Sequence, residues 1–375
     1  MGHLLHIATR KGVFAVERAA NGRGWSITGA SFLGDNCSMV LRDPRDGVLY
    51  AALGHGHFGV KLHRSRDGGS NWEEITAPQY PPMPEGYEPK KHPFFGTPIA
   101  WKLELIWCLE PGGASQPGRL WCGTLPGGLF RSDDGGTTWE LNRVLWDDPR
   151  REEWFGGGYP QPGIHSVCLH PKHPDHLSLG ISCGGVWHTT DAGKTWKQHE
   201  GGMRAEYMPP EQAFEPNSQD PHRLVRCADH PEVMWVQHHN GIFRSTDGGM
   251  NWVESLNVKP ANFGFAVAAH PHNPDVAWFV PGIKDEKRIP VDGKLVVTRT
   301  RDGGKTFDQL TNGLPQQHAY DLVFRHALDV DESGDILAFG STTGSLFISE
   351  NGGEKWECIS NYLPPIHAVR FAASR

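Results

Sequence analysis

The 375-residue sequence contains no run of 18 apolar residues, the length that a membrane-spanning helix needs. It also contains no block of five like charges, and its formal net charge is −7. Binding to nucleic-acid phosphates requires a basic stripe, and attachment to an acidic lipid surface requires a polybasic cluster. We therefore expect neither a nucleic acid nor a membrane as a partner of this chain.

No Cys-x-x-Cys pair occurs among the seven cysteines, and their number is odd. Several of them lie in apolar runs, such as Cys108 within residues 105–109, which predicts buried free thiols in a reducing compartment. The N-terminus lacks the charged segment and long apolar run of a secretory signal. A cytoplasmic location is the resulting expectation.

Glycine, proline and tryptophan are abundant instead, at 46, 29 and 14 residues. This composition favours many short strands joined by tight turns. One turn motif, Ser/Thr-x-Asp-x-Gly-x-Thr/Asn-Trp with small variations, occurs six times: at residues 65–72, 132–139, 189–196, 245–252, 300–307 and 349–356. Its Asp can accept hydrogen bonds from its own turn, its Gly supplies a positive φ, and its aromatic residue packs the turn against the strands. Each copy therefore predicts a hairpin.

A seventh, decayed copy keeps the Gly and Trp of the motif at residues 21–25, but Ala20 stands where Asp is expected. The aromatic residues that close the seven turns are Trp25, Trp72, Trp139, Trp196, Trp252, Phe307 and Trp356. Their spacing of roughly 50 residues is typical of a four-stranded blade. The first blade lacks an innermost strand, and residues 366–371 offer a spare one. We predict an all-β, seven-bladed β-propeller with four-stranded blades, a single domain over residues 1–375, closed by this C-terminal strand.

The repeated turn resembles the Asp-box, or BNR repeat, of sialidases and related propellers. This resemblance implies a glycosyl hydrolase that acts on a glycan, with a carbohydrate as the expected ligand. Seven-bladed Asp-box propellers are similar to each half of the two-domain xyloglucanases, to photosystem assembly factors that look like interaction scaffolds, and to polysaccharide lyases that use His and Tyr. Two alternatives to the hydrolase therefore stay open, because fold does not determine function. One is a binding scaffold without chemistry, and the other is a His-centred enzyme of metal-dependent or lyase type.

The expected site lies on the propeller face opposite the Asp-boxes. The boxes close the turns between third and fourth strands, so their carboxylates are expected to be structural. Four long insertions are expected on the other face, at residues 73–98, 142–163, 199–222 and 281–292. Loops of this length in a compact repeat are usually functional. We therefore expect the ligand at the channel mouth that these insertions surround.

A hydrolase needs a general acid and a second carboxylate that flank one bond. Aligning the starts of the innermost strands gives one column around the channel: Ser38, Leu105, His165, Val225, Phe265, Asp321 and His367. Asp321 is the only carboxylate in it, so we predict Asp321 and His165 as catalytic residues. The second carboxylate is predicted to come from an insertion, as Asp147, Glu152 or Glu153.

The residues predicted to bind substrate come from the same mouth and its loops: Arg10, His55, His57, Trp154, His238, His239, Arg288 and His367. Convergent imidazoles could also hold a divalent ion. No local motif such as His-Glu-x-x-His occurs, so no metal ligand is assigned. A metal, the one cofactor that the residues suggest, would be held by members of the group His55, His57, His165 and His239.

Overall fold

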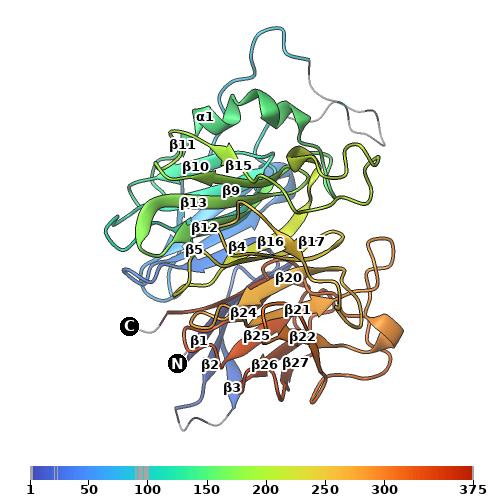
Figure 1. The fold of residues 1–375 in the computed structure, drawn as a ribbon. Helices are drawn as coiled ribbons and strands as arrows, with labels where there is room; N and C mark the ends of the chain where they lie inside the picture. Colours follow the sequence, from blue (N-terminus) through green and yellow to red (C-terminus); the bar gives the residue numbers. More distant parts are fainter. Residues whose placement is uncertain are drawn as a thin grey trace.

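The structure is a computed structural model that describes residues 3–20, 22, 24–88, 91, 96 and 101–373. Its strands form seven four-stranded antiparallel sheets arranged in a ring (Figure 1), which confirms the predicted all-β, seven-bladed propeller. The first insertion lies only partly within the described residues, because residues 89–90, 92–95 and 97–98 of it are outside them.

The blades follow one another along the chain. The first consists of β28 (Ile366–Phe371), β1 (Leu4–Thr9), β2 (Gly12–Arg18) and β3 (Trp25–Ser31). The second consists of β4 (Asn36–Arg42), β5 (Leu49–Gly54), β6 (Val60–Ser65) and β7 (Glu73–Ile75). The third consists of β8 (Leu105–Pro111), β9 (Leu120–Leu125), β10 (Leu129–Ser132) and β11 (Glu140–Leu141). The fourth consists of β12 (Ile164–His170), β13 (His173–Ile181), β14 (Gly185–Thr189) and β15 (Lys197–Gln198).

The remaining three blades have the same order. The fifth consists of β16 (Pro221–Arg226), β17 (Met234–His238), β18 (Gly241–Ser245) and β19 (Val253–Glu254). The sixth consists of β20 (Gly264–Ala269), β21 (Ala277–Pro281), β22 (Val297–Thr300) and β23 (Asp308–Leu310). The seventh consists of β24 (Leu328–Val330), β25 (Leu337–Gly340), β26 (Leu346–Ser349) and β27 (Glu357–Ser360).

Helices in the described residues are short. They are η1 (Gly56–Phe58), α1 (Arg143–Trp146), η2 (Pro149–Glu153), η3 (Pro216–Ser218) and η4 (Val291–Gly293). None of the helices in this part of the chain has the length and apolarity needed to cross a bilayer.

The ring is closed by the C-terminal strand, as predicted. β28 pairs antiparallel with β1, and the two ends of the chain lie near each other in Figure 1. The backbone N–H of Val369 also donates to the carbonyl of His326 at 2.8 Å, which links β28 to the segment before β24. Closure gives the first blade its fourth strand, so that β1 is paired along both of its edges.

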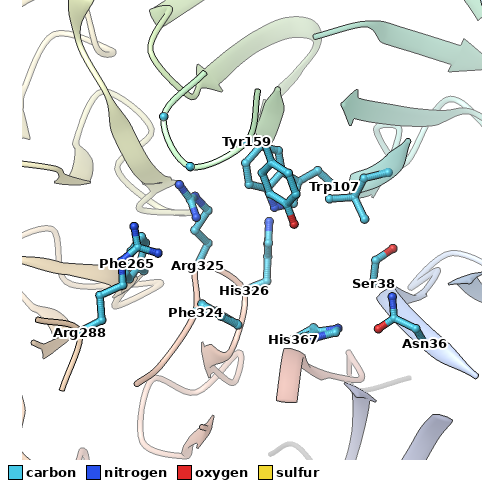
Figure 2. Close-up of a pocket in the computed structure, with 13 residues that line it drawn as sticks. Asn36, Ser38, Trp107, Tyr159, Phe265, Arg288, Phe324, Arg325, His326 and His367 are labelled. Atoms are coloured by element: carbon cyan, nitrogen blue, oxygen red, sulfur yellow. The ribbon is translucent and has the colours of Figure 1, made fainter. Parts of the chain in front are cut away.

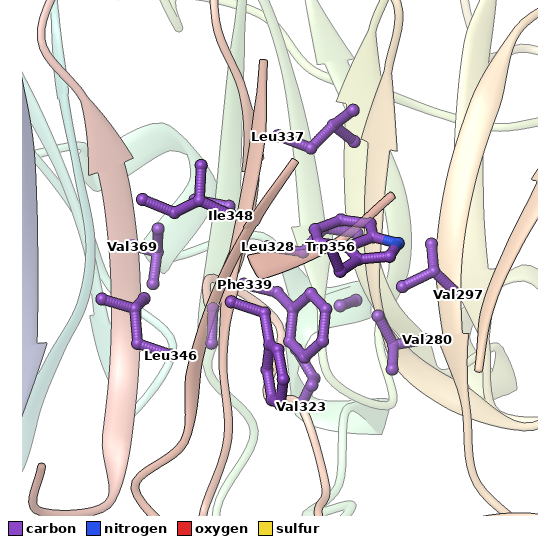
Figure 3. Close-up of a cluster of buried hydrophobic side chains, with 14 of the residues drawn as sticks. Val280, Val297, Val323, Leu328, Leu337, Phe339, Leu346, Ile348, Trp356 and Val369 are labelled. Carbon is purple, nitrogen blue, oxygen red and sulfur yellow. The ribbon is translucent and has the colours of Figure 1, made fainter. Parts of the chain in front are cut away.

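Apolar side chains fill the space between neighbouring blades. Figure 3 shows the cluster between the sixth and seventh blades, where Phe339, Leu346 and Trp356 pack together and Val369 of the closing strand joins them. The Trp356 ring lies 4.9 Å from that of Phe339 in an edge-on contact. The Asp-box aromatic residue therefore joins the inter-blade core, which is why the motif repeats once per blade.

The Asp-box turns have the hydrogen bonds that their sequence predicts. In the second blade, Ser65 Oγ donates to Asp67 Oδ1 at 2.8 Å, and the backbone N–H groups of Gly69 and Asn71 donate to Ser65 Oγ and Asp67 Oδ1, each at 2.8 Å. Gly69 has a φ of +96°, a value that L-residues with side chains rarely adopt. The carboxylates are thus fully engaged in their own turns.

The last box carries Asn351 in place of Asp and keeps the same geometry. Ser349 Oγ donates to Asn351 Oδ1 at 3.0 Å, and the backbone N–H of Lys355 donates to that same oxygen at 3.0 Å. The decayed first copy closes differently, because the N–H of Ala19 donates to the Gly24 carbonyl at 3.0 Å. A carboxylate is therefore not essential to form the turn.

These turns predict an acid-dependent loss of stability. Hydrogen bonds from the turn lower the pKa of Asp67, Asp191 and Asp302 to about 2. The unfolded-state pKa of Asp is ~3.9, so the contribution of these groups is fully present above about pH 4 and is lost as pH falls toward 2. The triple variant Asp67→Asn, Asp191→Asn, Asp302→Asn should show a shallower decline of unfolding free energy in urea between pH 5 and pH 2.5. Equal slopes for both proteins would contradict this assignment.

Candidate functional site

A β-bulge near the start of the innermost strand sets which side chains reach the channel. In six blades the pairing of the first and second strands skips a residue at this point. The residues at the bulge are Ser38, Trp107, His165, His222, Phe265 with Ala266, and His367. In the seventh blade, Leu328 pairs with Phe339, and the equivalent pair of the sixth blade is Val267 with Phe279. His326 lies two residues before Leu328, as Phe265 lies two residues before Val267, so His326 occupies the equivalent position.

This register corrects the predicted column at three positions. Trp107, His222 and His326 stand where the sequence alignment placed Leu105, Val225 and Asp321. The bulges and the irregular segment before β24 add residues that a fixed-spacing alignment cannot account for. The column therefore contains four imidazoles and no carboxylate.

A central cavity of about 260 Å³ lies at the end of the channel where the innermost strands begin. Five of the column residues line it: Ser38, Trp107, Phe265, His326 and His367. Figure 2 shows Tyr159 beside Trp107 on one side of the cavity and Arg288 beside Phe265 on the other. The Asp-boxes lie at the opposite end of the blades, because β6 begins on the cavity side and ends at Ser65.

The central cavity is basic and has unused hydrogen-bonding capacity. None of its thirteen lining residues is acidic. The Arg325 guanidinium lies 4.9 Å from the Trp107 ring and 5.1 Å from the Phe265 ring, and its buried Nε has no partner among the described residues. His326 is only 5% exposed, and both of its ring nitrogens are likewise buried without a partner among the described residues. Unpaired polar groups in a buried wall are costly unless a ligand pairs with them.

Burial keeps the channel histidines neutral. It holds the pKa of His165 and that of His326 well below the ordinary value, and the nearby arginine charges act in the same direction. His165 Nδ1 contacts Ser166 Oγ at 2.9 Å, while its Nε2 is buried without a partner in the described structure. His165 is 0% exposed and lines neither cavity, whereas His326 lines the central one. A neutral imidazole can either donate or accept a hydrogen bond, so His326 suits both hydroxyl and carboxylate groups.

A side cavity of about 540 Å³ adjoins the central one and shares Gly157, Gly158, Tyr159 and Arg288 with it. Its acidic lining residues are Asp220 and Asp285. Asp285 forms an ion pair with Arg288 at 2.5 Å, whereas the Asp220 side chain is only 2% exposed. This cavity therefore adds carboxylates to a mouth that is otherwise cationic.

Asp220 is held by groups from three segments. Its Oδ1 accepts from the backbone N–H of Cys183 at 3.2 Å, and its Oδ2 lies 3.3 Å from His222 Nε2 and 3.5 Å from His239 Nδ1. Burial alone would raise the pKa of this carboxyl, but the two facing imidazoles and the Arg325 charge hold it well below its ordinary value. Asp220 is thus an ionised carboxylate at the base of the side cavity.

Glycine at position 157 allows a loop to lie directly on this carboxylate. A Cβ there would be 2.6 Å from Cys183 Sγ and 3.0 Å from Asp220 Oδ2, so any side chain would displace the loop or the site. Residues 157–159 belong to the 142–163 insertion, Asp220 to the 199–222 insertion, and Arg288 to the 281–292 insertion. Three of the four insertions therefore contribute to the two cavities.

The predicted catalytic carboxylates lie apart from these cavities. Asp321 is 8% exposed and accepts hydrogen bonds from Ser341 Oγ at 2.7 Å and Thr343 Oγ1 at 2.5 Å, within the seventh blade. Asp147 pairs with Arg143 at 2.9 Å beside α1, and the Glu152 side chain is 60% exposed on η2. None of the three lines either cavity.

Several predicted binding residues do reach the cavities, and others do not. Arg288 and His367 line the central cavity, and Arg288 and His239 line the side cavity. Trp154 is 3% exposed and packs edge-on against Trp187, so its ring is part of the core.

The other predicted binding residues lie outside the cavity walls. His238 is fully buried, and burial lowers its pKa to about 3. Arg10 and His57 are exposed, and His55 is half-buried. None of these four residues lines the central or the side cavity.

The sequence analysis missed Asp220, His222, Arg325 and His326. A signal for two of them was present, since Asp220 and His222 occupy alternate positions at the start of an innermost strand, where one strand face points to the channel. Arg325 and His326 precede a strand of only three residues, Leu328–Val330, which gives too little periodicity to set the register.

Comparison with known proteins identifies the repeat and the relatives. The BNR/Asp-box repeat model matches residues 130–141, which contain the second box. The xyloglucanase Xgh74A of Acetivibrio thermocellus is 22% identical over 302 residues, which are 70% of this chain and 32% of that protein. The chain thus spans about a third of the length of this curated relative.

Solved structures show the same architecture. An ancestral GH74 enzyme has a TM-score of 0.58 at 16% identity, over 87% of this chain and 38% of that one. YCF48 bound to a D1 peptide has a TM-score of 0.50 at 15% identity, over 94% of this chain and 91% of that one. At such low identity these likenesses show the fold alone. With its repeated turns and seven blades, this chain is a β-propeller that carries BNR/Asp-box repeats. Its sequence is similar to that of a xyloglucanase.

Proposed function

We propose that this propeller is a carbohydrate-active enzyme of glycosyl-hydrolase type whose glycan lies across the central and side cavities. The observation that carries the proposal is the composition of the central wall. Trp107 and Tyr159 offer aromatic rings, and both ring nitrogens of His326 and the Nε of Arg325 are buried without partners in the described residues. Sugars present apolar ring faces and many hydroxyl groups, so aromatic surface beside free donors and acceptors is the lining they require.

The charge of the central cavity supports an acidic sugar as part of the substrate. Arg325 and Arg288 both line it, and its lining contains no Asp or Glu. Arg recognises carboxylates through paired, charge-assisted hydrogen bonds, which are about twice as strong as neutral ones. A glycan with a carboxylate-bearing unit would therefore bind more tightly than a neutral glycan of the same length.

The carboxylates of the side cavity support bond cleavage next to this binding wall. Glycoside hydrolysis by an acid and a second carboxylate requires both groups beside the same bond. Asp220 and Asp285 line the side cavity, whereas Asp321, Asp147 and Glu152 line neither cavity. The proposed chemistry thus moves from the residues predicted from the sequence to Asp220, with Asp285 as its neighbour.

A Trp107→Ala variant tests the proposed binding wall. Calorimetric titrations with neutral xyloglucan oligosaccharides and with uronic-acid-containing oligosaccharides should show binding to the unsubstituted protein, together with release of reducing sugar. Truncating a buried aromatic anchor costs about 2 kcal/mol or more, so affinity should fall roughly 30-fold or more. Tyr362→Ala is the control, because Tyr362 is 96% exposed and lines neither cavity.

The outcomes separate the hypotheses. Binding without reducing-sugar release would support a glycan as the ligand and would reject hydrolysis as the activity. Release of an unsaturated product from the uronic-acid substrate would indicate a lyase. No binding of either oligosaccharide class at millimolar concentration would reject the proposed ligand.

A further inference from the structure

Asp220, His222 and His239 bring three potential metal-ligand atoms together at one edge of the side cavity. These atoms all lie within 4.8 Å of one another, and the group is formed by the start of β16 and the turn after β17. We propose that this cluster binds a divalent first-row transition metal ion. This inference goes beyond the proposed glycan activity and is tested without substrate. In the metal-loaded protein Asp220 would act as a ligand of the ion rather than as a free carboxylate.

The distances match coordination better than hydrogen bonding. Asp220 Oδ2 lies 3.3 Å from His222 Nε2 and 3.5 Å from His239 Nδ1. A charge-assisted N–H···O bond is about 2.7–2.9 Å long, and the His272–Asp229 pair of this same chain has 2.8 Å. Ligand atoms around a tetrahedral ion with bonds of ~2.0–2.1 Å are separated by about 3.3–3.4 Å. The distances from Asp220 Oδ2 to the two imidazole nitrogens are therefore close to those around a bound ion.

The surrounding hydrogen bonds orient two of the ligands. His222 Nδ1 lies 2.6 Å from the carbonyl oxygen of Gly264. A carbonyl only accepts, so Nδ1 carries a proton, and Nε2 is the ring nitrogen that faces Asp220 and can bind an ion in the neutral imidazole. Asp220 Oδ1 accepts from Cys183 N–H at 3.2 Å and from Ser182 Oγ at 3.4 Å, which leaves Oδ2 for the ion. Such outer partners are characteristic of protein metal sites.

The third ligand leaves the site open on one side. The His239 side chain is 22% exposed, against 2% for Asp220 and 1% for His222. His239 and Asp220 line the side cavity, so the remaining coordination positions would face the space proposed for the glycan. Two imidazoles and one carboxylate favour zinc, iron or manganese over magnesium and calcium, which prefer oxygen ligands.

The test uses the full-length protein, stripped with a chelator and then titrated with Zn²⁺ in a calorimeter and with Co²⁺ in a visible spectrometer. We expect one ion per chain and a visible Co²⁺ band. His239→Ala should weaken binding by at least about 100-fold, since loss of an outer partner alone costs 10–100-fold. His239 is the chosen position because it is partly exposed, and an unchanged melting temperature of the stripped variant would show that it folds.

Two control variants identify other sources of binding. His57→Ala removes an exposed imidazole that belongs to neither cavity and should bind as the unsubstituted protein does. His176→Ala disrupts a separate group of histidines, in which the rings of His173 and His176 stack 4.8 Å apart. The proposal is overturned if no stoichiometric binding occurs, or if His176→Ala abolishes binding and His239→Ala does not. Stoichiometric metal binding by an unsubstituted protein that neither binds nor cleaves the oligosaccharides would reject the proposed function alone.

Discussion

A chain that ends at Pro365 is expected to lose its folded structure rather than to form a six-bladed or open ring. Such a chain lacks β28, the innermost strand of the first blade. Ile366, Ala368 and Val369 are all 0% exposed, and burying an Ile or Val side chain contributes about 1.5–3 kcal/mol. Their loss would also expose β1 along the edge where it pairs with β28.

A buried ion pair adds to this cost. Arg370 donates from both Nη atoms to Glu110 at 2.7 and 2.8 Å, with side chains that are only 20% and 14% exposed. Deleting β28 removes these hydrogen bonds between charged groups, and a hydrogen bond to a charged group contributes about 1.5–3 kcal/mol. Domains of this kind have a net stability of about 5–15 kcal/mol, so the combined loss is comparable to all of it.

Circular dichroism and size-exclusion chromatography would measure the outcome. A chain that ends at Ala373 keeps β28 and serves as the matched control. Addition of a synthetic peptide of residues 364–373 to the truncated chain should restore structure, because the strand pairs with β1 without any covalent requirement. A monomeric truncated protein with the melting temperature of the control would contradict the role of β28 in closure.

The fold could be predicted because its signal is local. One Asp-box turn spans eight residues and contains Ser65, Asp67, Gly69 and Trp72. Hydrogen bonds within it join residues that are close in the sequence, so a fixed sequence spacing is enough to recognise the turn. Six such copies and the decayed seventh copy give the blade number, and the spare strand at residues 366–371 followed from the missing innermost strand of the first blade. The closing strand pairs with a strand from the other end of the chain. This pairing could still be predicted, because the first blade is the one that lacks a fourth strand.

The site could be predicted only in part, because its side chains are placed by irregularities. One skipped residue per bulge moves a side chain between the channel and the sheet interior, since successive residues of a strand face opposite sides. The predicted column was right for His165, which lies at a bulge, and wrong for Asp321, which bonds within its own blade. Asp220 and Arg325 are 105 positions apart, and no spacing rule relates them. Their encounter depends on ring closure and on loop conformation.

Arg325→Met is expected to lower affinity for uronic-acid-containing oligosaccharides by roughly 10- to 100-fold, because a hydrogen bond to a charged group contributes about 1.5–3 kcal/mol. Affinity for neutral oligosaccharides should change much less. The substitution removes the guanidinium, whose central carbon lies over the Trp107 and Phe265 rings, and keeps an unbranched apolar side chain in its place. Calorimetric titrations at low and high salt would measure both effects, and the salt dependence of acidic-ligand binding should weaken in the variant.

Stability distinguishes a binding role of Arg325 from a structural one. Burial lowers the pKa of this guanidinium, and its Nε is buried without a partner among the described residues. Replacing such a group by an apolar side chain of similar volume should leave the melting temperature unchanged or raise it. Arg301→Met is the control, since Arg301 is 62% exposed within an Asp-box on the opposite face. A lower melting temperature together with an equal loss of affinity for neutral and acidic oligosaccharides would assign Arg325 to packing and reject its role in recognising a carboxylate.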